Sequence, residues 1–475
     1  MARVLLLQDS GINESLALAE CAGELARHGH HVHLLLGDEE PNLDAQIRAY
    51  DPHMVVLPCS VAGEAWPMQA AARAKRVAPR ALVAMGGTHV TFSPEVALDP
   101  SVDAAIVGEA EGALVDLANA MSTGRDWRGT ANVAYKDGDR LVKNPLRPLI
   151  ADLDSLPMPD RDLYFRYPFM GKFPWKKFAS GRGCMHACSF CWNNSVKQMY
   201  GAGGEFVRRK SPERVVAEIE VVRRKYPLRH IHFSDDIFTV YPSWIEKFAP
   251  LYRAKVGLPF TCSSTVELLS ERTVNALREA NCYGIAMGLE TGNEDLREKI
   301  LKKRVTNDDV RTAAARVKAA GIKLTTFNMI ASPGETLEDA MQTMRLNREI
   351  GADAVRLQIA VPIPHTEFAE QALSAGLLEG GSKVRDLSRP DVSFTTPEAR
   401  ELRNLYYLFR IGVHLPRSES LVRALVKLPF ALDPLRLWVP FEEKRIYNLR
   451  WRDGIPFFWH IGDPHRRTTN YVTLV

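Results

Sequence analysis

Residues 176–192 read KKFASGRGCMHACSFCW, a short strand pattern followed at once by three of the chain's seven cysteines. Cys184, Cys188 and Cys191 have the spacing C-x3-C-x2-C. A structural zinc site takes four ligands, usually from two cysteine or histidine pairs, and only one C-x2-C pair occurs here. His186 lies between the first two cysteines on a tight loop, where its ring cannot easily reach the same metal. The spacing therefore favours a [4Fe-4S] cluster with three thiolate ligands and one open iron.

The region that begins with these cysteines predicts six strand–helix units. The expected strands are 176–180, 230–236, 260–265, 283–290, 323–330 and 355–363. Ser211, Ser270, Thr306 and Thr336 are good N-caps for the helices, and Gly321 suits a helix C-terminus. Six units are fewer than the eight that close a full barrel, so we expect an open, partial (β/α)6 barrel.

Reactive groups in such barrels lie at the carboxyl ends of the strands. Besides the cysteine loop, the residues expected at these ends are Asp235, Asp236, Ser263, Ser264, Glu290 and 332–335. Asp235, Asp236 and Glu290 are candidate catalytic groups, although each also fits an ordinary role as a strand-end or helix-capping carboxylate.

The first 120 residues predict a second α/β unit. Near-continuous apolar runs at 3–7, 31–36, 53–57, 81–85 and 103–107 alternate with helical patterns, which is typical of a doubly wound, Rossmann-like parallel sheet. Ligands bind beyond the carboxyl ends of such strands. Small, flexible or acidic residues follow those ends: Ser60, Val61, Ala62, Gly63, Gly86, Gly87, Gly108, Glu109 and Glu111. Glycines there allow a large flat ligand to approach the backbone, but turn formation explains each one equally well.

These patterns divide the chain into four regions. We expect a Rossmann-like domain at 1–125, a hairpin and linker at 126–170, the partial barrel at 171–380 and a mainly helical region at 381–475. The last region contains the aromatic residues Trp438, Trp451, Phe457, Phe458 and Trp459. They favour an apolar or ring-bearing small-molecule substrate if they line a pocket, and they are core residues otherwise. The helical segments there are expected to form a lid over the barrel or, alternatively, to touch a membrane surface.

The composition excludes several classes of protein. Hydrophobic residues make up 46% and charged residues 25% of the 475 residues, and the formal net charge is +4, too near zero to indicate a nucleic-acid partner. No leader pattern opens the sequence and no apolar run approaches the length of a transmembrane segment, so we expect a cytoplasmic protein. Cys21, Cys59, Cys262 and Cys282 are scattered and are expected to be buried, reduced thiols.

The cysteine motif, with Phe190 just before its last cysteine, resembles that of the radical S-adenosylmethionine (SAM) superfamily. The segments FSDDIF (233–238), GLETGNEDL (288–296) and SPGET (332–336) match the later strand ends of that family in order. One departure is visible at 330–332, where Ile-Ala-Ser replaces a glycine-rich stretch. The resemblance implies that the three cysteines ligate the cluster, that the open iron chelates SAM, and that the reduced cluster cleaves SAM to a 5′-deoxyadenosyl radical.

The same resemblance implies roles for individual side chains. Phe190 is expected to contact the adenine of SAM, Glu290 and Ser263 to bond its ribose or amino group, and Ser332 to lie at the same site. Asp235 and Asp236 are expected to face the substrate or to support groups that do. Reducing electrons are expected from a flavodoxin- or ferredoxin-type donor.

The first domain resembles the cobalamin-binding domain of the B12-dependent radical SAM subfamily, on Gly86-Gly87 and Gly108-Glu109-x-Glu111. The loop 8–13, QDSGIN, lacks the histidine of the Asp-x-His-x-x-Gly motif, so cobalamin is expected to bind without that lower ligand and with residues 59–66 on its lower side. A domain that kept its fold and lost its ligand is the alternative.

The subfamily resemblance implies methyl transfer from SAM to an unactivated carbon of a biosynthetic intermediate. A radical cyclase or rearrangement catalyst of tetrapyrrole, lipid or secondary-metabolite synthesis is the alternative. A methylthiotransferase is disfavoured because it needs three further cysteines, and residues 1–175 contain only Cys21 and Cys59. An electron-transfer or regulatory iron–sulfur protein would leave the SAM-like strand ends unused.

Overall fold

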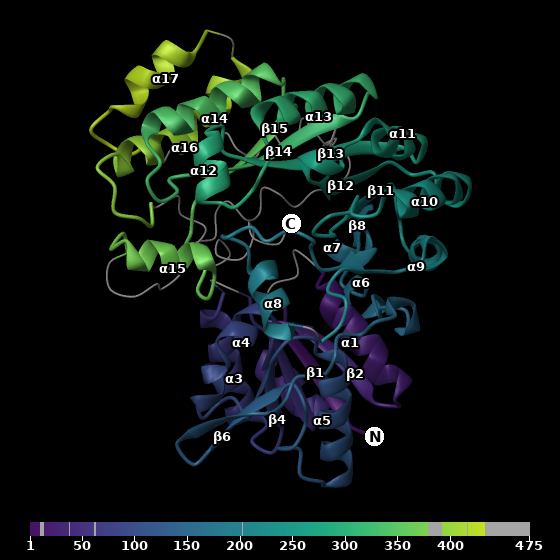
Figure 1. The fold of residues 1–475 in the computed structure, drawn as a ribbon. Coiled ribbons are helices and arrows are strands. Elements are labelled where there is room, and N and C mark those ends of the chain that lie inside the picture. Colours follow the sequence, from purple (N-terminus) through teal and green to yellow (C-terminus); the bar gives the residue numbers. More distant parts are fainter. Residues whose placement is uncertain are drawn as a thin grey trace.

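The computed structural model describes residues 1–9, 14–37, 39–60, 63–201, 203–378, 392–415 and 417–432 (Figure 1). The predicted contacts Val61 and Ala62, most of the loop 8–13 and the aromatic residues from Trp438 to Trp459 lie outside these ranges. Figure 1 shows two lobes, the first built from the N-terminal sheet and the second from the barrel, with helix α8 (Trp192–Tyr200) between them.

The first lobe contains a sheet whose described strands have the order β2-β1-β3-β4-β5-β6-β7. Its strands are β1 (Arg3–Gln8), β2 (His31–Leu36), β3 (Met54–Pro58), β4 (Leu82–Gly86), β5 (Ala104–Ile106), β6 (Val133–Asp137) and β7 (Arg140–Lys143). The first five are parallel, which confirms the doubly wound fold. The predicted hairpin forms β6 and β7, and β6 extends the sheet by pairing antiparallel with β5.

Both faces of this sheet are covered because its strands are apolar on both sides. Along β1, Val4 and Leu6 pack into one core and Leu5 and Leu7 into another, and all four are fully buried. The helices around the sheet are α1 (Leu16–Arg27), α2 (Leu43–Tyr50), α3 (Ala65–Val77), α4 (Thr88–Phe92) and α5 (Glu111–Thr123). A 3-10 turn over Pro94–Leu98 follows α4.

The barrel sheet consists of six parallel strands in the order β15-β14-β13-β12-β11-β8. They are β8 (Trp175–Phe178), β11 (His230–Phe233), β12 (Phe260–Ser264), β13 (Cys282–Glu290), β14 (Lys323–Ile330) and β15 (Ala354–Ile359). Strands β8 and β15 stand at opposite edges of this described sheet, so the barrel is open, as predicted.

Helices cover the outer face of this sheet and connect its strands. They are α9 (Pro212–Lys225), α10 (Pro242–Lys255), α11 (Glu271–Glu279), α12 (Glu294–Lys299), α13 (Asn307–Ala319) and α14 (Leu337–Glu349). The four predicted N-caps are confirmed, and Thr306 and Thr336 form full capping boxes. Short helices α6 (Asp162–Phe165) and α7 (Pro168–Gly171) precede β8, and α15 (Glu367–Ser374) follows β15.

The two faces of the barrel sheet differ in chemistry. On the outer face, Phe233 packs with its ring centroid 5.7 Å from that of Phe248 on α10. On the inner face, His232 Nδ1 lies 2.9 Å from Thr261 Oγ1, and the Arg356 guanidinium lies 5.6 Å from the Phe327 ring centroid. Since β-strand side chains alternate, the interior of the barrel is polar where the outer layer is aromatic.

Helices α16 (Ala399–His414) and α17 (Glu419–Val426) follow the barrel. Helix α16 packs on α14, and α17 packs on α16, with Val422 and Val426 buried. Val422 and Val426 of α17 therefore face protein, whereas Leu421 of the same helix is exposed. Among the described residues no helix has both the length and the apolar character needed to cross a membrane. The four scattered cysteines are buried free thiols, as expected.

Candidate functional site

The three cysteines lie on a segment that leaves the carboxyl end of β8 and is closed at its base by a two-stranded ribbon. Strand β9 (Gly181–Arg182) pairs antiparallel with β10 (Arg208–Arg209), with Arg182 opposite Arg208. Residues 183–191 connect β9 to α8 and contain Cys184, Cys188 and Cys191; they are called the cysteine segment below. All three thiols are free and only partly buried, so they remain open to a ligand.

The surroundings of the thiols affect their ionisation in opposite directions. Desolvation raises the pKa of Cys188 to about 11 and that of Cys191 to about 12, and it also raises the pKa of Cys184. The charge of Lys303 opposes this at Cys184 and Cys188, and the Asn193 N–H in the first turn of α8 opposes it at Cys191. The thiols of the metal-free chain are therefore protonated at neutral pH, and iron binding would displace their protons.

The donor set fits an iron–sulfur cluster better than a mononuclear metal ion. Within the described ranges, no group of three or more His, Cys, Asp or Glu side chains is placed to hold one metal ion. A [4Fe-4S] cluster makes a different demand, because each thiolate binds a different iron. The positive charge of Lys303 and the N-terminus of α8 would both stabilise the negative charge of a thiolate-bound cluster.

Glu290 is paired with a lysine that the sequence analysis missed. Lys303 Nζ lies 3.1 Å from Glu290 Oε1 and donates to the Gly288 carbonyl at 2.6 Å, with only 7% of its side chain exposed. A Cβ atom on Gly288 would collide with both side-chain ends, so the glycine leaves them room to meet in this position. Lys303 belongs to the run Lys302-Lys303-Arg304, in which nothing marks the middle residue as the buried one.

The two aspartates after β11 have different surroundings. Asp235 is 4% exposed, accepts hydrogen bonds from Ser180 N at 3.1 Å and Ser180 Oγ at 2.6 Å, and lies 3.5 Å from Arg209. These contacts of Asp235 therefore fix the position of Ser180, which directly precedes the ribbon that leads into the cysteines. Packing of protein around its carboxyl group, together with the charge of Asp235, raises the pKa of Asp236. Its charge raises the pKa of Cys184 and Cys191, which places it beside the thiols. Catalytic roles for either residue stay predictions.

Phe190 lies between the second and third cysteines, and Ser263 lies on strand β12. The Phe190 ring packs against a buried cluster that includes Leu301 and Phe368. Ser263 on β12 is buried and stands beside Ala286 of β13. Contacts of these residues with SAM stay predictions.

The turn after β14 contains Ser332, whose N–H donates to Glu335 at 2.8 Å. Ala331 there has φ +63°, the left-handed region that favours glycine. The sequence at this turn lacks the glycine-rich stretch of the family, but Ala331 still adopts the backbone conformation that glycine adopts most easily.

The carboxyl end of the first sheet faces α8. The Glu109 N–H donates to the Tyr200 hydroxyl at 3.1 Å, and a Cβ on Gly108, whose φ is +78°, would collide with that hydroxyl. Phe92 of α4 lies beside Trp192, with ring centroids 6.3 Å apart. Helix α8, which follows the cysteines, therefore packs directly on the carboxyl edge of the first sheet, where the predicted cobalamin contacts lie.

The other predicted contacts at this edge have distinct local roles. Gly87 has φ +109°, and a Cβ there would lie 2.7 Å from the Cys59 carbonyl oxygen, whereas Gly86 has ordinary packing distances. Ser60 is exposed. Glu109 and Glu111 form ion pairs with Arg182 of the ribbon. Contacts of all these residues with cobalamin stay predictions.

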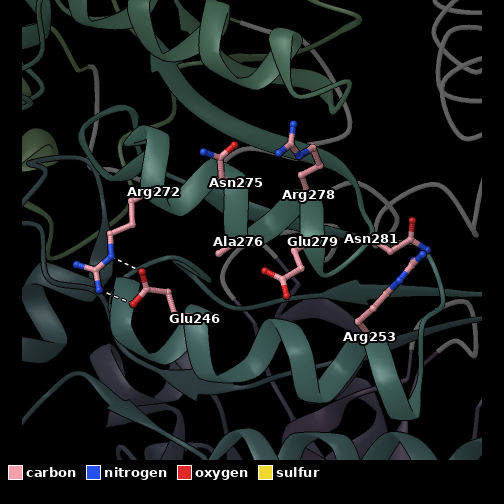
Figure 2. Close-up of a pocket in the computed structure, with 8 residues that line it drawn as sticks. All are labelled: Glu246, Arg253, Arg272, Asn275, Ala276, Arg278, Glu279 and Asn281. Carbon is pink, nitrogen blue, oxygen red and sulfur yellow. Dashed lines mark hydrogen bonds and ion pairs between the residues drawn. The ribbon is translucent and has the colours of Figure 1, made fainter.

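A pocket of about 780 Å³ lies elsewhere, between α10 and α11 on the outside of the barrel (Figure 2). It is lined by charged and amide side chains, and Arg272 and Glu246 form an exposed ion pair at one end. It contains none of the predicted site residues.

Known proteins resemble this chain in both halves. A family model described as the radical SAM superfamily matches residues 179–346, and one described as the B12 binding domain matches residues 2–118. An uncharacterized methyltransferase from Pyrococcus horikoshii is 29% identical, over 76% of this chain and 79% of its own length. The anaerobic magnesium-protoporphyrin IX monomethyl ester cyclase of Rubrivivax gelatinosus is 26% identical, over 68% of this chain and 58% of its own length.

A solved structure shares the fold. The radical SAM methyltransferase TsrM from Kitasatospora setae, with cobalamin and a [4Fe-4S] cluster bound, superposes with a TM-score of 0.66 over 79% of this chain and 75% of its own, at 17% identity. The two family models match the two lobes in the order in which they occur along the chain. The chain therefore carries a radical SAM domain, matched over residues 179–346, behind a B12-binding domain, matched over residues 2–118.

Proposed function

We propose that the protein transfers a methyl group from SAM to an unactivated carbon of a small biosynthetic intermediate, using a [4Fe-4S] cluster and cobalamin. The observation that carries the proposal is the contact between α8, which follows the cysteines directly, and the carboxyl end of the B12-binding sheet, through Tyr200 with Glu109 and Trp192 with Phe92. A chemistry that uses both cofactors in one reaction requires such an apposition.

Each part of the chain has a defined task in this proposal. When bound, the cluster supplies an electron to SAM and cobalamin supplies a methyl carrier. Cys184, Cys188 and Cys191 would bind the iron–sulfur cluster. Glu290 and Lys303 form a zwitterionic pair at the end of β13, which suits the oppositely charged amino and carboxylate groups of SAM.

The named relatives agree with this reaction class, since one is a methyltransferase and the structural neighbour is a radical SAM methyltransferase with both cofactors bound. The acceptor is expected to be a small molecule, as tryptophan is for the structural neighbour. We further expect reduction by a flavodoxin- or ferredoxin-type donor.

The test is an anaerobic reconstitution with iron, sulfide and cobalamin, followed by reaction with SAM labelled in its methyl group. About four irons and one cobalamin per chain, with label transferred to the cobalamin and then to an added acceptor, are the expected results. Retention of both cofactors without any transfer of label from SAM would refute the proposal.

A radical cyclase is the second candidate, favoured by the similarity to the magnesium-protoporphyrin cyclase over 68% of this chain. The two reactions differ in their SAM products. Methyl transfer gives S-adenosylhomocysteine together with 5′-deoxyadenosine, whereas cyclisation gives 5′-deoxyadenosine alone. Chromatography of the SAM products separates the two.

A further inference from the structure

The ribbon β9–β10 joins the two lobes through side chains that alternate between its faces. Consecutive residues on a strand point to opposite sides. Arg208 and Lys210 contact carboxylates of the B12-binding domain, and Lys210 also pairs with Glu218 of α9. Arg209 between them contacts the barrel. The base of the cysteine segment is therefore attached to both lobes at once.

The attachment to the B12-binding domain centres on Arg182, two residues before Cys184. Its guanidinium lies 2.6 Å from Glu20 of α1 and 2.9 Å from Glu109 after β5, and it also pairs with Glu111 of α5. These three carboxylates come from three different elements of the first domain. A planar guanidinium with five N–H donors can meet all of them from one position, and a lysine cannot.

The neighbouring basic residues complete a charge-balanced layer. Arg208 lies 2.9 Å from Glu109, and Lys210 lies 2.9 Å from Glu20. The side chains of Arg208 and Lys210 are only 5% and 4% exposed. Burial would raise the pKa of Glu20, but the charges of Arg182 and Lys210 outweigh it and lower that pKa to about 2. Glu20 is therefore ionised throughout the neutral range.

The attachment to the barrel runs through Arg209. It lies 3.5 Å from Asp235, donates to Ser180 Oγ at 2.8 Å and stacks on Trp244 with 4.3 Å between its guanidinium carbon and the ring centroid. Ser180 is the last residue before the ribbon. The cysteine segment is thus fixed against the barrel at the point where it begins.

We propose that Arg182 is a positioning residue that holds the cysteine segment at one fixed height above the B12-binding edge, and so sets the separation between the bound cluster and the bound cobalamin. The inference rests on the proposed function only in requiring that both cofactors bind. It assigns Glu109 and Glu111 a structural task at the interface between the lobes, in addition to any contact with cobalamin.

The test compares Arg182→Gln with Arg182→Lys and with the control Arg272→Gln, which breaks an exposed arginine–glutamate pair on the outer face of the barrel (Figure 2). Pulsed electron paramagnetic resonance (EPR) measures the distance between the reduced cluster and cob(II)alamin in each reconstituted protein. Arg182→Gln is expected to keep both individual spectra and to broaden or shift the distance distribution. Arg182→Lys is expected to be intermediate, and Arg272→Gln to match the wild type.

A second measurement needs no cofactor. Backbone hydrogen exchange of residues 184–200 in the metal-free proteins is expected to be about tenfold faster in Arg182→Gln than in wild type and unchanged in Arg272→Gln. An unchanged distance distribution together with unchanged exchange would overturn the proposal. If cobalamin does not bind at all, the claim about the separation of the cofactors is overturned, and the exchange result tests only whether Arg182 anchors the cysteine segment.

The failure of this inference is distinguishable from that of the proposed function. Wild-type protein that holds both cofactors at a sharp distance but transfers no methyl group would refute the function and leave the positioning role intact. Wild-type protein that transfers methyl groups, with Arg182→Gln indistinguishable from it in all measurements, would refute only the positioning role.

Discussion

Replacing Glu335 by glutamine should stabilise the metal-free protein in a pH-dependent way. Glu335 is 3% exposed, in the turn after β14, and accepts the Ser332 N–H at 2.8 Å. Burial raises its pKa from 4.5 to about 8, with a further rise from the charge of Asp339 and an opposing effect of the Ser332 hydrogen bond. The folded protein therefore keeps a proton on this carboxyl between about pH 4.5 and pH 8, and the unfolded chain does not.

The sign of the effect follows from that difference in bound protons. Where the folded state binds more protons than the unfolded state, the free energy of unfolding falls as pH rises. The wild type therefore loses stability between pH 4.5 and pH 8, and above pH 8 Glu335 causes no further change in the free energy of unfolding. At about 1.4 kcal/mol per unit, the loss is on the order of 3–5 kcal/mol. Glu335→Gln keeps the shape and the acceptor oxygen without the titration.

The assay is denaturant unfolding of both proteins at intervals from pH 5 to pH 8.5. The two should be nearly equal at pH 5, and the variant should unfold at a progressively higher denaturant concentration up to pH 8. A constant difference at all pH values, or a wild type that gains on the variant towards pH 8, would refute the reasoning.

Three further predictions concern the cysteine segment. Cys188→Ala should lose most of its iron and its cluster absorbance after reconstitution, whereas a variant of the buried thiol Cys262 to alanine should retain both. Lys303→Met removes a positive charge beside two of the thiols, so the cluster's reduction potential, measured by EPR-monitored titration, should become more negative by on the order of 50 mV. Gly108→Ala should cost about 2–3 kcal/mol in thermal unfolding, from the strain of φ +78° and the loss of the Tyr200–Glu109 hydrogen bond, and the cost should shrink when Tyr200 is also replaced by alanine.

Features set by local patterns could be predicted from the sequence. The apolar runs of both sheets, the helix caps at Thr306 and Thr336 and the turn at Asp137-Gly138 all depend on residues within a few positions of each other. The order of strand–helix units then limited the topology to a doubly wound sheet and an open barrel, because parallel strands need such crossovers.

Features set by distant contacts could not be predicted. Arg182 pairs with carboxylates 71 and 162 positions away, and nothing in the local sequence separates it from other exposed arginines. The same is true of Lys303, which is 13 positions from its partner Glu290 in a run of three basic residues. The hairpin itself was predictable, but its attachment to β5 was not, since edge pairing depends on the completed sheet.

The charged layer between the lobes also bears on biosynthesis. The B12-binding domain is synthesised first, and it must wait for the barrel before its docking face is covered. That face presents Glu20, Glu109 and Glu111, which water solvates well, beside the apolar ring of Phe92. Exposed apolar surface on a half-finished chain promotes aggregation, and carboxylates do not. The nascent domain can therefore remain dispersed near the ribosome until the arginines of the ribbon emerge and close the interface.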